Sequence, residues 1–361
     1  MLQGAVLPED RADLLFHSYD GGGVSISGPS LLVRKSFATN FSASANYYVD
    51  KVSSASIDVV TTASPYSEER TQYSVGMDYL HDRWILNVGF TKSEENDYLA
   101  NNFSIGISQD VFGDLTTISL GYSLGNDEVG RRGDAVFSEE IQRQQYRLGL
   151  SQILTQNLLL GLSFETITDE GFLNNPYRSV RFVDTDSAVG YSFEPEIYPR
   201  TRTSDAAAIR LRYYLPYRAA IHGEYRAYSD TWDISSSSFE VGYTHPVEGG
   251  WIFEGKLRTY SQDRADFFAD LFPSSQYQNF MARDKELSTF SSTTLHFGAS
   301  YDIMRSGWRF FERGSVSFSY DFIQFDYEDF RNLTQPTGLA GDEPLYGFDA
   351  NVIQLFVSFW F

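Results

Sequence analysis

The sequence of 361 residues contains no cysteine, which excludes a disulfide framework, thiolate chemistry and cysteine metal sites. It contains no run of about eighteen apolar residues either, so a membrane-spanning helix is excluded. Basic residues are few, because 28 Lys and Arg stand against 48 Asp and Glu, a formal net charge of -20. Nucleic-acid phosphates require a basic surface, and we therefore expect no nucleic-acid partner.

Aromatic residues, in contrast, are abundant. The chain has 24 Tyr and 29 Phe, yet its mean hydropathy is below zero. A transmembrane β-barrel combines these properties, because alternate residues face lipid and water and aromatic girdles lie at both interfaces. No composition break divides the chain, so we predict a single domain, with an N-terminal segment at 1–11 and a barrel at 12–361.

The C-terminal stretch from Asn351 to Phe361 carries the clearest signal. Phe361, Phe359 and Val357 begin an apolar row at every second position, which is typical of a strand with one lipid-facing side. The pattern resembles the C-terminal aromatic signature by which the assembly machinery of outer-membrane barrels recognises its substrates. A core strand of a soluble sandwich is the alternative, but its uncovered edge would promote aggregation.

Alternation predicts fifteen strands from residue 29 to the C-terminus. A single-chain barrel normally has an even number of strands and both termini on the periplasmic side, so one more strand is expected at 12–19, turning through 20–23. We predict sixteen strands, with fourteen as the alternative. The other predicted strands are 29–37, 41–50, 71–80, 84–91, 103–109, 115–124, 142–153, 158–168, 206–215, 219–229, 235–245, 251–261, 289–301, 315–327 and the terminal strand.

Short turns are expected on the periplasmic side and long acidic loops on the extracellular side. Residues 1–15 lack the apolar core of a signal peptide, so we expect the numbering to start at or near a mature N-terminus. The predicted extracellular loops are 51–69, 92–101, 125–141, 169–204, 230–234, 262–288 and 328–350.

Several segments resemble the bacterial domain-of-unknown-function family 3570 (DUF3570), whose members are predicted outer-membrane proteins. Family members often occur near small lipoproteins, thioredoxin-like proteins and flavin-transfer proteins, so the resemblance implies an envelope redox or metal-handling context. The matching segments are LPEDRAD (7–13), YDGGGV (19–24), NYYVD (46–50), SSASIDVVT (53–61), SPYSEER (64–70), DVFGDLTT (110–117), DEGFLNNPYRSVR (169–181), YPRTRTS (198–204), RYYLPYRAA (212–220) and ARDKELSTF (282–290).

If the apolar rows face lipid, the opposite rows line a lumen with a basic wall. A ring of charge of this kind selects which small solutes pass, and sixteen strands leave room for an aqueous channel. The alternative is that the charges pair with one another and solvate a plugged interior. The predicted lumen residues are Arg143, Arg147, Arg210, Arg212, Arg226, Lys256, Arg258, Glu224 and Glu254.

The loop 169–204 is the longest, and its prolines indicate a structured element. Its arginines Arg178, Arg181, Arg200 and Arg202 are expected to join the basic strands if the loop folds inward as a constriction. Alternatively, the loop caps the barrel or docks a partner.

Nothing in the sequence indicates an enzyme. His222 and His296 are expected to point into the lumen on separate strands, without a GxSxG elbow, so we interpret them as solvated side chains and predict no catalytic residue. We also predict no cofactor and no metal site, because the acidic stretches 126–134 and 326–329 lack EF-hand spacing. Calcium binding by these loops stays open.

These observations predict an outer-membrane barrel that acts as a passive, porin-like channel for small polar or charged solutes. The alternative is a non-conducting barrel that anchors or encloses a lipoprotein or a redox partner of the envelope. Outer-membrane lipids and the barrel assembly machinery are the other expected partners. Replacement of Arg210, Arg212 and Arg226 by Glu would invert the ion preference of a channel.

Overall fold

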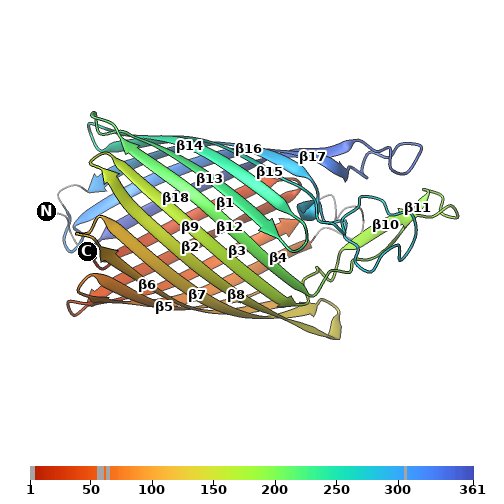
Figure 1. The fold of residues 1–361 in the computed structure, drawn as a ribbon, viewed down its shortest axis with the longest axis horizontal. Helices are drawn as coiled ribbons and strands as arrows, with labels where there is room; N and C mark the ends of the chain where they lie inside the picture. The colour runs from red at the N-terminus through yellow and green to blue at the C-terminus, as the bar shows by residue number, and fades with distance from the viewer. Residues whose placement is uncertain (1–4, 55–60, 62–65, 305–306) are drawn as a thin grey trace.

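The chain forms a closed antiparallel β-barrel of sixteen strands in a computed structural model. The structure describes residues 5–54, 61, 66–304 and 307–361. Neighbouring barrel strands follow one another along the chain, except that β9 pairs with β12 across a loop that holds the small hairpin β10–β11. Both chain ends lie at one end of the barrel, the termini end, and β10–β11 projects from the opposite end, the loop end (Figure 1).

The strands are long because the barrel wall continues beyond the apolar band. None of the helices among the described residues is long and apolar enough to span a membrane, and the helix η1 (Lys285–Leu287) is a single 3-10 turn. The strands are β1 (Arg11–Gly21), β2 (Val24–Phe37), β3 (Phe41–Ser54), β4 (Tyr66–His81), β5 (Trp84–Glu94), β6 (Tyr98–Val111), β7 (Thr116–Arg131), β8 (Asp134–Thr155), β9 (Leu158–Gly171), β10 (Ser179–Val183), β11 (Tyr191–Pro195), β12 (Thr201–Tyr214), β13 (Ala220–Asp230), β14 (Ser235–Val247), β15 (Trp251–Gln262), β16 (Phe290–Met304), β17 (Arg313–Arg331) and β18 (Leu345–Trp360).

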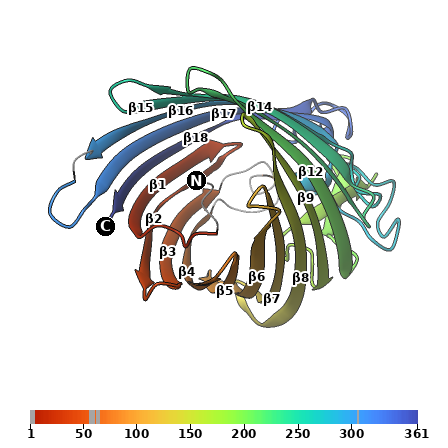
Figure 2. The same ribbon diagram turned by 60° about the vertical axis from the view of Figure 1, so that its left-hand side comes forward.

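The prediction of sixteen strands is confirmed, including the first strand, which was inferred from the need for an even number of strands. β1 pairs with β2 on one side and with the final strand β18 on the other, which closes the ring (Figure 2). The β1–β2 turn uses Gly22 and Gly23 at φ of 58° and 78°, a conformation that glycine adopts without strain. In the final strand, Val357 and Phe359 stand opposite Leu14 and Ala12 of β1.

Two of the predicted long loops are mostly strand. The predicted loop 92–101 is reduced to residues 95–97, and the predicted loop 125–141 is reduced to residues 132–133 between β7 and β8. Polar strand ends beyond the lipid-facing band still pair through their backbones, but they show no apolar alternation by which the sequence would reveal them. Most of the predicted loop 51–69 lies outside the described residues.

The outward face of the barrel is apolar over a band between two groups of aromatic residues. Near the termini end, Tyr79 contacts Trp84 with ring centroids 5.6 Å apart. Toward the loop end, Tyr47 and Tyr73 lie 5.2 Å apart on adjacent strands and are both exposed. Aromatic groups in these two positions correspond to the interfacial girdles of a transmembrane barrel.

A close backbone contact between β2 and β3 leaves no room for a side chain at one glycine. A Cβ atom on Gly28 would lie 1.7 Å from the carbonyl oxygen of Val49 in β3, well inside van der Waals contact. We expect Gly28→Ala to force β2 and β3 apart and to cost about 1–3 kcal/mol, as overpacking does. The midpoint of urea-induced unfolding in detergent or lipid measures this loss.

Gly255 provides the matched control, because the nearest atom to its added Cβ is the His296 carbonyl oxygen at 4.0 Å. Gly255→Ala should leave the unfolding midpoint unchanged. Equal midpoints for both variants would show that the contact at Gly28 is not restrictive.

Candidate functional site

Alternation along the strands identifies the inward face of the barrel. On β12, Ile209 and Leu211 are exposed apolar side chains of the outward row, so Arg210 and Arg212 belong to the inward row. The same alternation on β8, β13 and β15 assigns the remaining predicted lumen residues to inward rows. These residues are Arg143, Arg147, Glu224, Arg226, Glu254, Lys256 and Arg258.

Most of the inward basic residues are paired with carboxylates of the same wall. Arg143 on β8 lies 2.6 Å from Asp169 on β9. Glu165 on β9 lies between two arginines, 3.0 Å from Arg147 and 3.4 Å from Arg226. The predicted basic wall is therefore a mixed-charge surface in this sector.

The same pairing continues on β12–β15, with two exceptions. Arg210 forms an ion pair with Glu224, and Lys256 lies 3.5 Å from Glu254. Arg212 and Arg258, in contrast, are exposed and have no ion-pair partner in the part of the chain that the structure describes. In the β12–β15 sector of the wall, the unpaired positive charge is therefore at these two arginines.

His222 and His296 differ from the prediction that they are solvated. The Nδ1 atom of His296 lies 2.7 Å from Asp321, and the His222 Nε2 atom lies 3.7 Å from Glu240. Only 14% of the His296 side chain and 11% of the His222 side chain are exposed. The His222 ring fits against the wall because its β14 neighbour Gly242 has no side chain in its place.

A polar network on β1, β3 and β4 was not identified from the sequence. The His17 Nε2 atom lies 2.6 Å from Asp50, and Arg70 lies 2.6 Å from the other oxygen of the same carboxylate. His17 also stacks on Tyr48, with ring centroids 5.0 Å apart. His17 reaches Asp50 across β2 because its partner in register there, Gly28, has no side chain. This network links β1 to β3 and β4 on the inner side of the wall.

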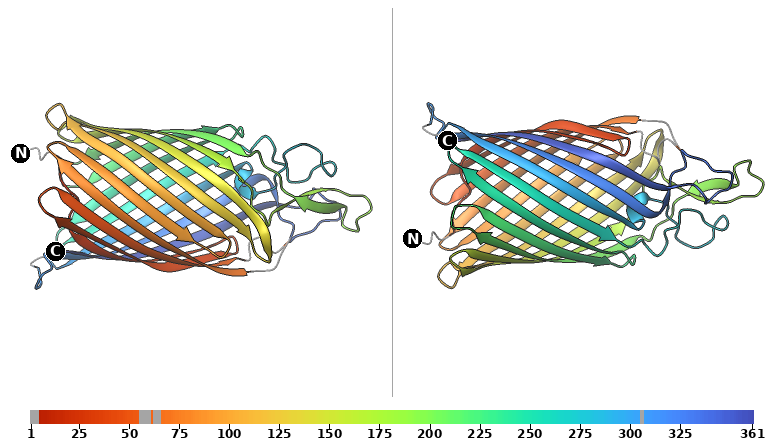
Figure 3. Two further views of the ribbon diagram at one scale, coloured as in Figure 1. Left: turned by 90° about the horizontal axis from the view of Figure 1, so that it is seen from below. Right: turned by 90° about the horizontal axis from the view of Figure 1, so that it is seen from above.

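Three loops at the loop end fold together into one body, which we call the cap and define as residues 172–200, 263–289 and 332–344. Its interior is a cluster of buried aromatic and aliphatic side chains at the rim of β12–β18. The β13–β14 turn contributes Trp232, which contacts Tyr198 and Phe267 edge-on. Figure 3 shows the cap at the end opposite the termini in both views. The predicted order of the loop 169–204 is thus explained by burial against two other loops.

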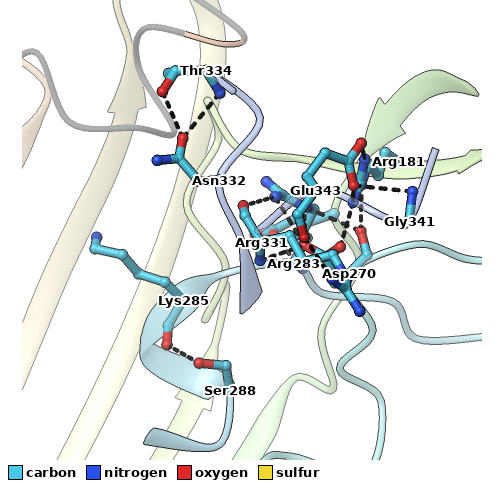
Figure 4. Close-up of polar contacts among 11 residues, drawn as sticks. Arg181, Asp270, Arg283, Lys285, Ser288, Arg331, Asn332, Thr334, Gly341 and Glu343 are labelled. Carbon is cyan, nitrogen blue, oxygen red and sulfur yellow. Dashed lines mark hydrogen bonds and ion pairs between the residues drawn. The ribbon is translucent and has the colours of Figure 1, made fainter. Parts of the chain in front are cut away.

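A group of buried charges joins these three loops (Figure 4). We call this group the clamp and define it as Arg181, Asp270, Arg283 and Glu343. Arg181 is fully buried and binds Glu343 through both terminal nitrogens, at 2.8 and 3.1 Å. Arg181 also pairs with Asp270, which lies 3.0 Å from Arg283. The Arg331 amide donates to the same Asp270 carboxylate at 3.1 Å. Each buried charge therefore has an opposite charge or hydrogen-bond partner, as a dry interior requires.

The four arginines predicted for a constriction in loop 169–204 lie in the cap and at the rim, where each pairs with an acid. Arg181 is a clamp residue and does not join the basic strands, as the constriction alternative expected, because a buried guanidinium needs carboxylates and the neighbouring loops supply them. Arg178 pairs with Asp284, Arg200 with Glu139 at 2.8 Å, and Arg202 with Asp230 at 2.5 Å.

The clamp makes the cap sensitive to acid. Burial alone would raise the pKa of Glu343, but its hydrogen bonds to Arg181 more than offset this effect and hold the pKa below the usual 4.5. A carboxyl whose pKa is lowered by folding stabilises the fold above its unfolded pKa, and this stabilisation is lost as the pH falls through the folded value. We expect the hydrogen-exchange protection of the cap amides, corrected for intrinsic rates, to decrease at pH values below about 4.5.

The barrel amides of β5 and β6 provide the reference in this measurement. Protection that declines equally in the cap and in these strands would contradict a role for Glu343.

A separate acidic group lies at the rim between β4 and β6. Oxygens of Glu68, Glu95 and Asp97 lie within 4.8 Å of one another, the one such group among the ranges that the structure describes. Burial and the neighbouring acids raise the pKa of Glu95, although Arg70 opposes the shift. The predicted acidic stretches 126–134 and 326–329 contribute no residue to this group.

Comparison with solved structures places the fold among outer-membrane barrels. A structure described as a bacterial polysaccharide outer membrane secretin has a TM-score of 0.51 and 9% identity, covering 97% of this chain and 98% of that chain. OccK2 (OpdF) of Pseudomonas aeruginosa, solved in complex with glucuronate, gives 0.45 and 11%, covering 99% and 100%. OmpT, an outer membrane protein of Vibrio cholerae, gives 0.45 and 9%, covering 98% and 97%. Similarity at this level concerns the fold alone.

Sequence comparison gives a narrower result. A search of curated protein sequences finds no match. A family model described as a protein of unknown function (DUF3570) matches residues 24–147 and 136–321, which confirms the resemblance carried by the sequence motifs. Because these matches span most of the barrel, the chain belongs to the DUF3570 family.

Proposed function

We propose that the protein is a passive channel of the bacterial outer membrane for small polar solutes, with a preference for anions. The observation that carries this proposal is the inward wall of β12–β15, where Arg212 and Arg258 are exposed and without an acidic partner among the described residues. Unpaired guanidinium groups in a lumen attract anions and repel cations. A barrel of sixteen strands is wide enough to hold an aqueous passage beside these side chains.

The proposed orientation places the termini end in the periplasm and the cap outside the cell. Short turns join the strands at the termini end, whereas the cap loops occupy the other end, and this asymmetry is typical of bacterial barrels. The terminal residues Phe361, Phe359 and Val357 then lie on the side from which the assembly machinery acts, and we propose them as its recognition signal. The outer-membrane lipids contact the apolar band.

A second function is favoured by the surface of the cap. Apolar side chains remain exposed there, including Val189 at 59%, Leu339 at 69% and Phe193 at 40%. Exposed apolar side chains gathered on an ordered element often mark a protein contact. The alternative is therefore a non-conducting barrel whose cap holds a lipoprotein or an envelope redox partner.

Planar-bilayer recording of the purified protein distinguishes the two functions. A channel gives discrete conductance steps, and in a salt gradient its reversal potential has the sign of anion selectivity. A partner-holding barrel gives no steps when pure, and a partner accompanies it through gentle extraction. Absence of conductance from correctly folded protein would refute the channel.

A further inference from the structure

One cap segment does not lie above the barrel but enters its mouth. Gln262 belongs to the inward row at the loop end of β15, and its side-chain amide donates to the carbonyl oxygens of Glu286 and Ser288, at 2.9 and 2.8 Å. The 3-10 turn η1 therefore lies on the lumen side of β15. Figures 1 and 3 agree, since η1 is seen at the loop end within the outline of the strands.

The turn is held rigidly in this position. Asp284 caps it by accepting the Glu286 amide at 2.9 Å, and the same carboxylate pairs with Arg178 from the neighbouring cap loop. The Arg283 amide donates to Glu196 at 2.7 Å, just before η1 begins. Leu287 is buried in the cap core, with 6% of its surface exposed. The start of η1 and its buried side are thus fixed by residues far away in the sequence.

The turn exposes one acidic side chain. Glu286 is exposed, in contrast to the buried Leu287 that follows it. Figure 4 shows the Lys285 side chain pointing away from the clamp residues. A turn on the lumen side of one wall narrows the mouth of the barrel, and this turn presents the charged Glu286 there.

We propose that residues 284–288 form the constriction of the channel, with Glu286 at its edge and the clamp as its anchor. The inference rests on the proposed channel function and adds the element that limits the flow of ions. The loop predicted for this role, 169–204, acts instead as the support that positions η1 through Arg178 and Glu196.

The absence of cysteine from the chain permits a direct test. Glu286→Cys introduces a single thiol at the proposed constriction, and Val189→Cys introduces one at the exposed tip of the cap hairpin. Both sites are exposed, so both variants should fold. Each is recorded in a planar bilayer before and after reaction with a bulky, neutral thiol reagent added on the cap side.

We expect the reagent to reduce the single-channel conductance of Glu286→Cys by about half or more, and to leave Val189→Cys unchanged. If the unmodified protein conducts and the reagent, shown by mass spectrometry to have reacted, changes neither variant, the constriction is refuted while the channel stands. If the unmodified protein does not conduct, the channel is refuted and the constriction with it. An equal reduction of conductance in both variants would also refute the constriction, because the effect would not be local to η1.

Discussion

Replacement of Arg181 by Met is expected to accelerate hydrogen exchange of the cap amides by about a hundredfold or more, because breaking a buried ion pair costs about 3–5 kcal/mol. The substitution keeps the volume of the side-chain stem but leaves Glu343 without the two hydrogen bonds that Arg181 supplies. Asp270 loses one of its arginine partners as well. Two buried carboxylates then favour an opened cap in which water solvates them.

The amides of Ile197 and Met281 report this opening, because each donates to the carbonyl of the other across two cap loops, at 3.0 and 2.8 Å. The barrel amides of β5 and β6 should keep their wild-type rates, which separates local opening from global unfolding. Exchange data from a folded, lipid-reconstituted sample therefore measure the clamp itself.

Arg200→Met is the matched control for this experiment. It makes the same substitution in the same loop, but the Arg200 side chain is 63% exposed and its ion pair with Glu139 lies at the surface. Exposed pairs contribute about 0–1 kcal/mol, so exchange should change by less than about fivefold. Similar effects of the two substitutions would mean that the clamp does not hold the cap.

The barrel itself could be predicted from the sequence because its pattern is local. The alternation of apolar and polar residues can be read from neighbouring positions alone. The need for an even number of strands indicated the weakly patterned first strand, which the structure shows as Arg11–Gly21. The ends of β7 and β8 could not be predicted in this way. They extend past the apolar band, where apolar and polar residues do not alternate regularly, and only the backbone pairing between β7 and β8, such as that of Gly130 with Ser138, reveals them as strand.

The candidate site was predictable only in part, since alternation gives the direction of a side chain but not its partner. It assigned Arg210 and Glu224 to the lumen, yet their pairing depends on the register between β12 and β13. The clamp lies further beyond sequence reasoning. Arg181 meets residues 89 and 162 positions away, and nothing in a single sequence links loops at that distance. The same limit applies to η1, whose place in the mouth is fixed by other loops.

Charge reversal of the two unpaired arginines on the inward wall of β12–β15 should shift ion selectivity toward cations. In the double variant Arg212→Glu with Arg258→Glu, each site changes by two charges, from attraction of anions to attraction of cations. The two sites change by about four unit charges in total, and each charge contributes about 1 kcal/mol at close range in water before screening by salt, so we expect the permeability ratio to shift by about tenfold or more. The reversal potential in a salt gradient measures this shift, which should shrink as ionic strength rises.

The control must carry the same change in net charge outside the lumen. Arg83 lies in the turn between β4 and β5 at the termini end, and Arg200 lies at the rim, and both side chains are largely exposed. Their double replacement by Glu should leave the reversal potential near its wild-type value, since exposed charges beyond a Debye length are screened from the passage. If both double variants shift equally, the selectivity arises from overall charge. A shift confined to Arg212 and Arg258 would locate it at the inward wall of β12 and β15.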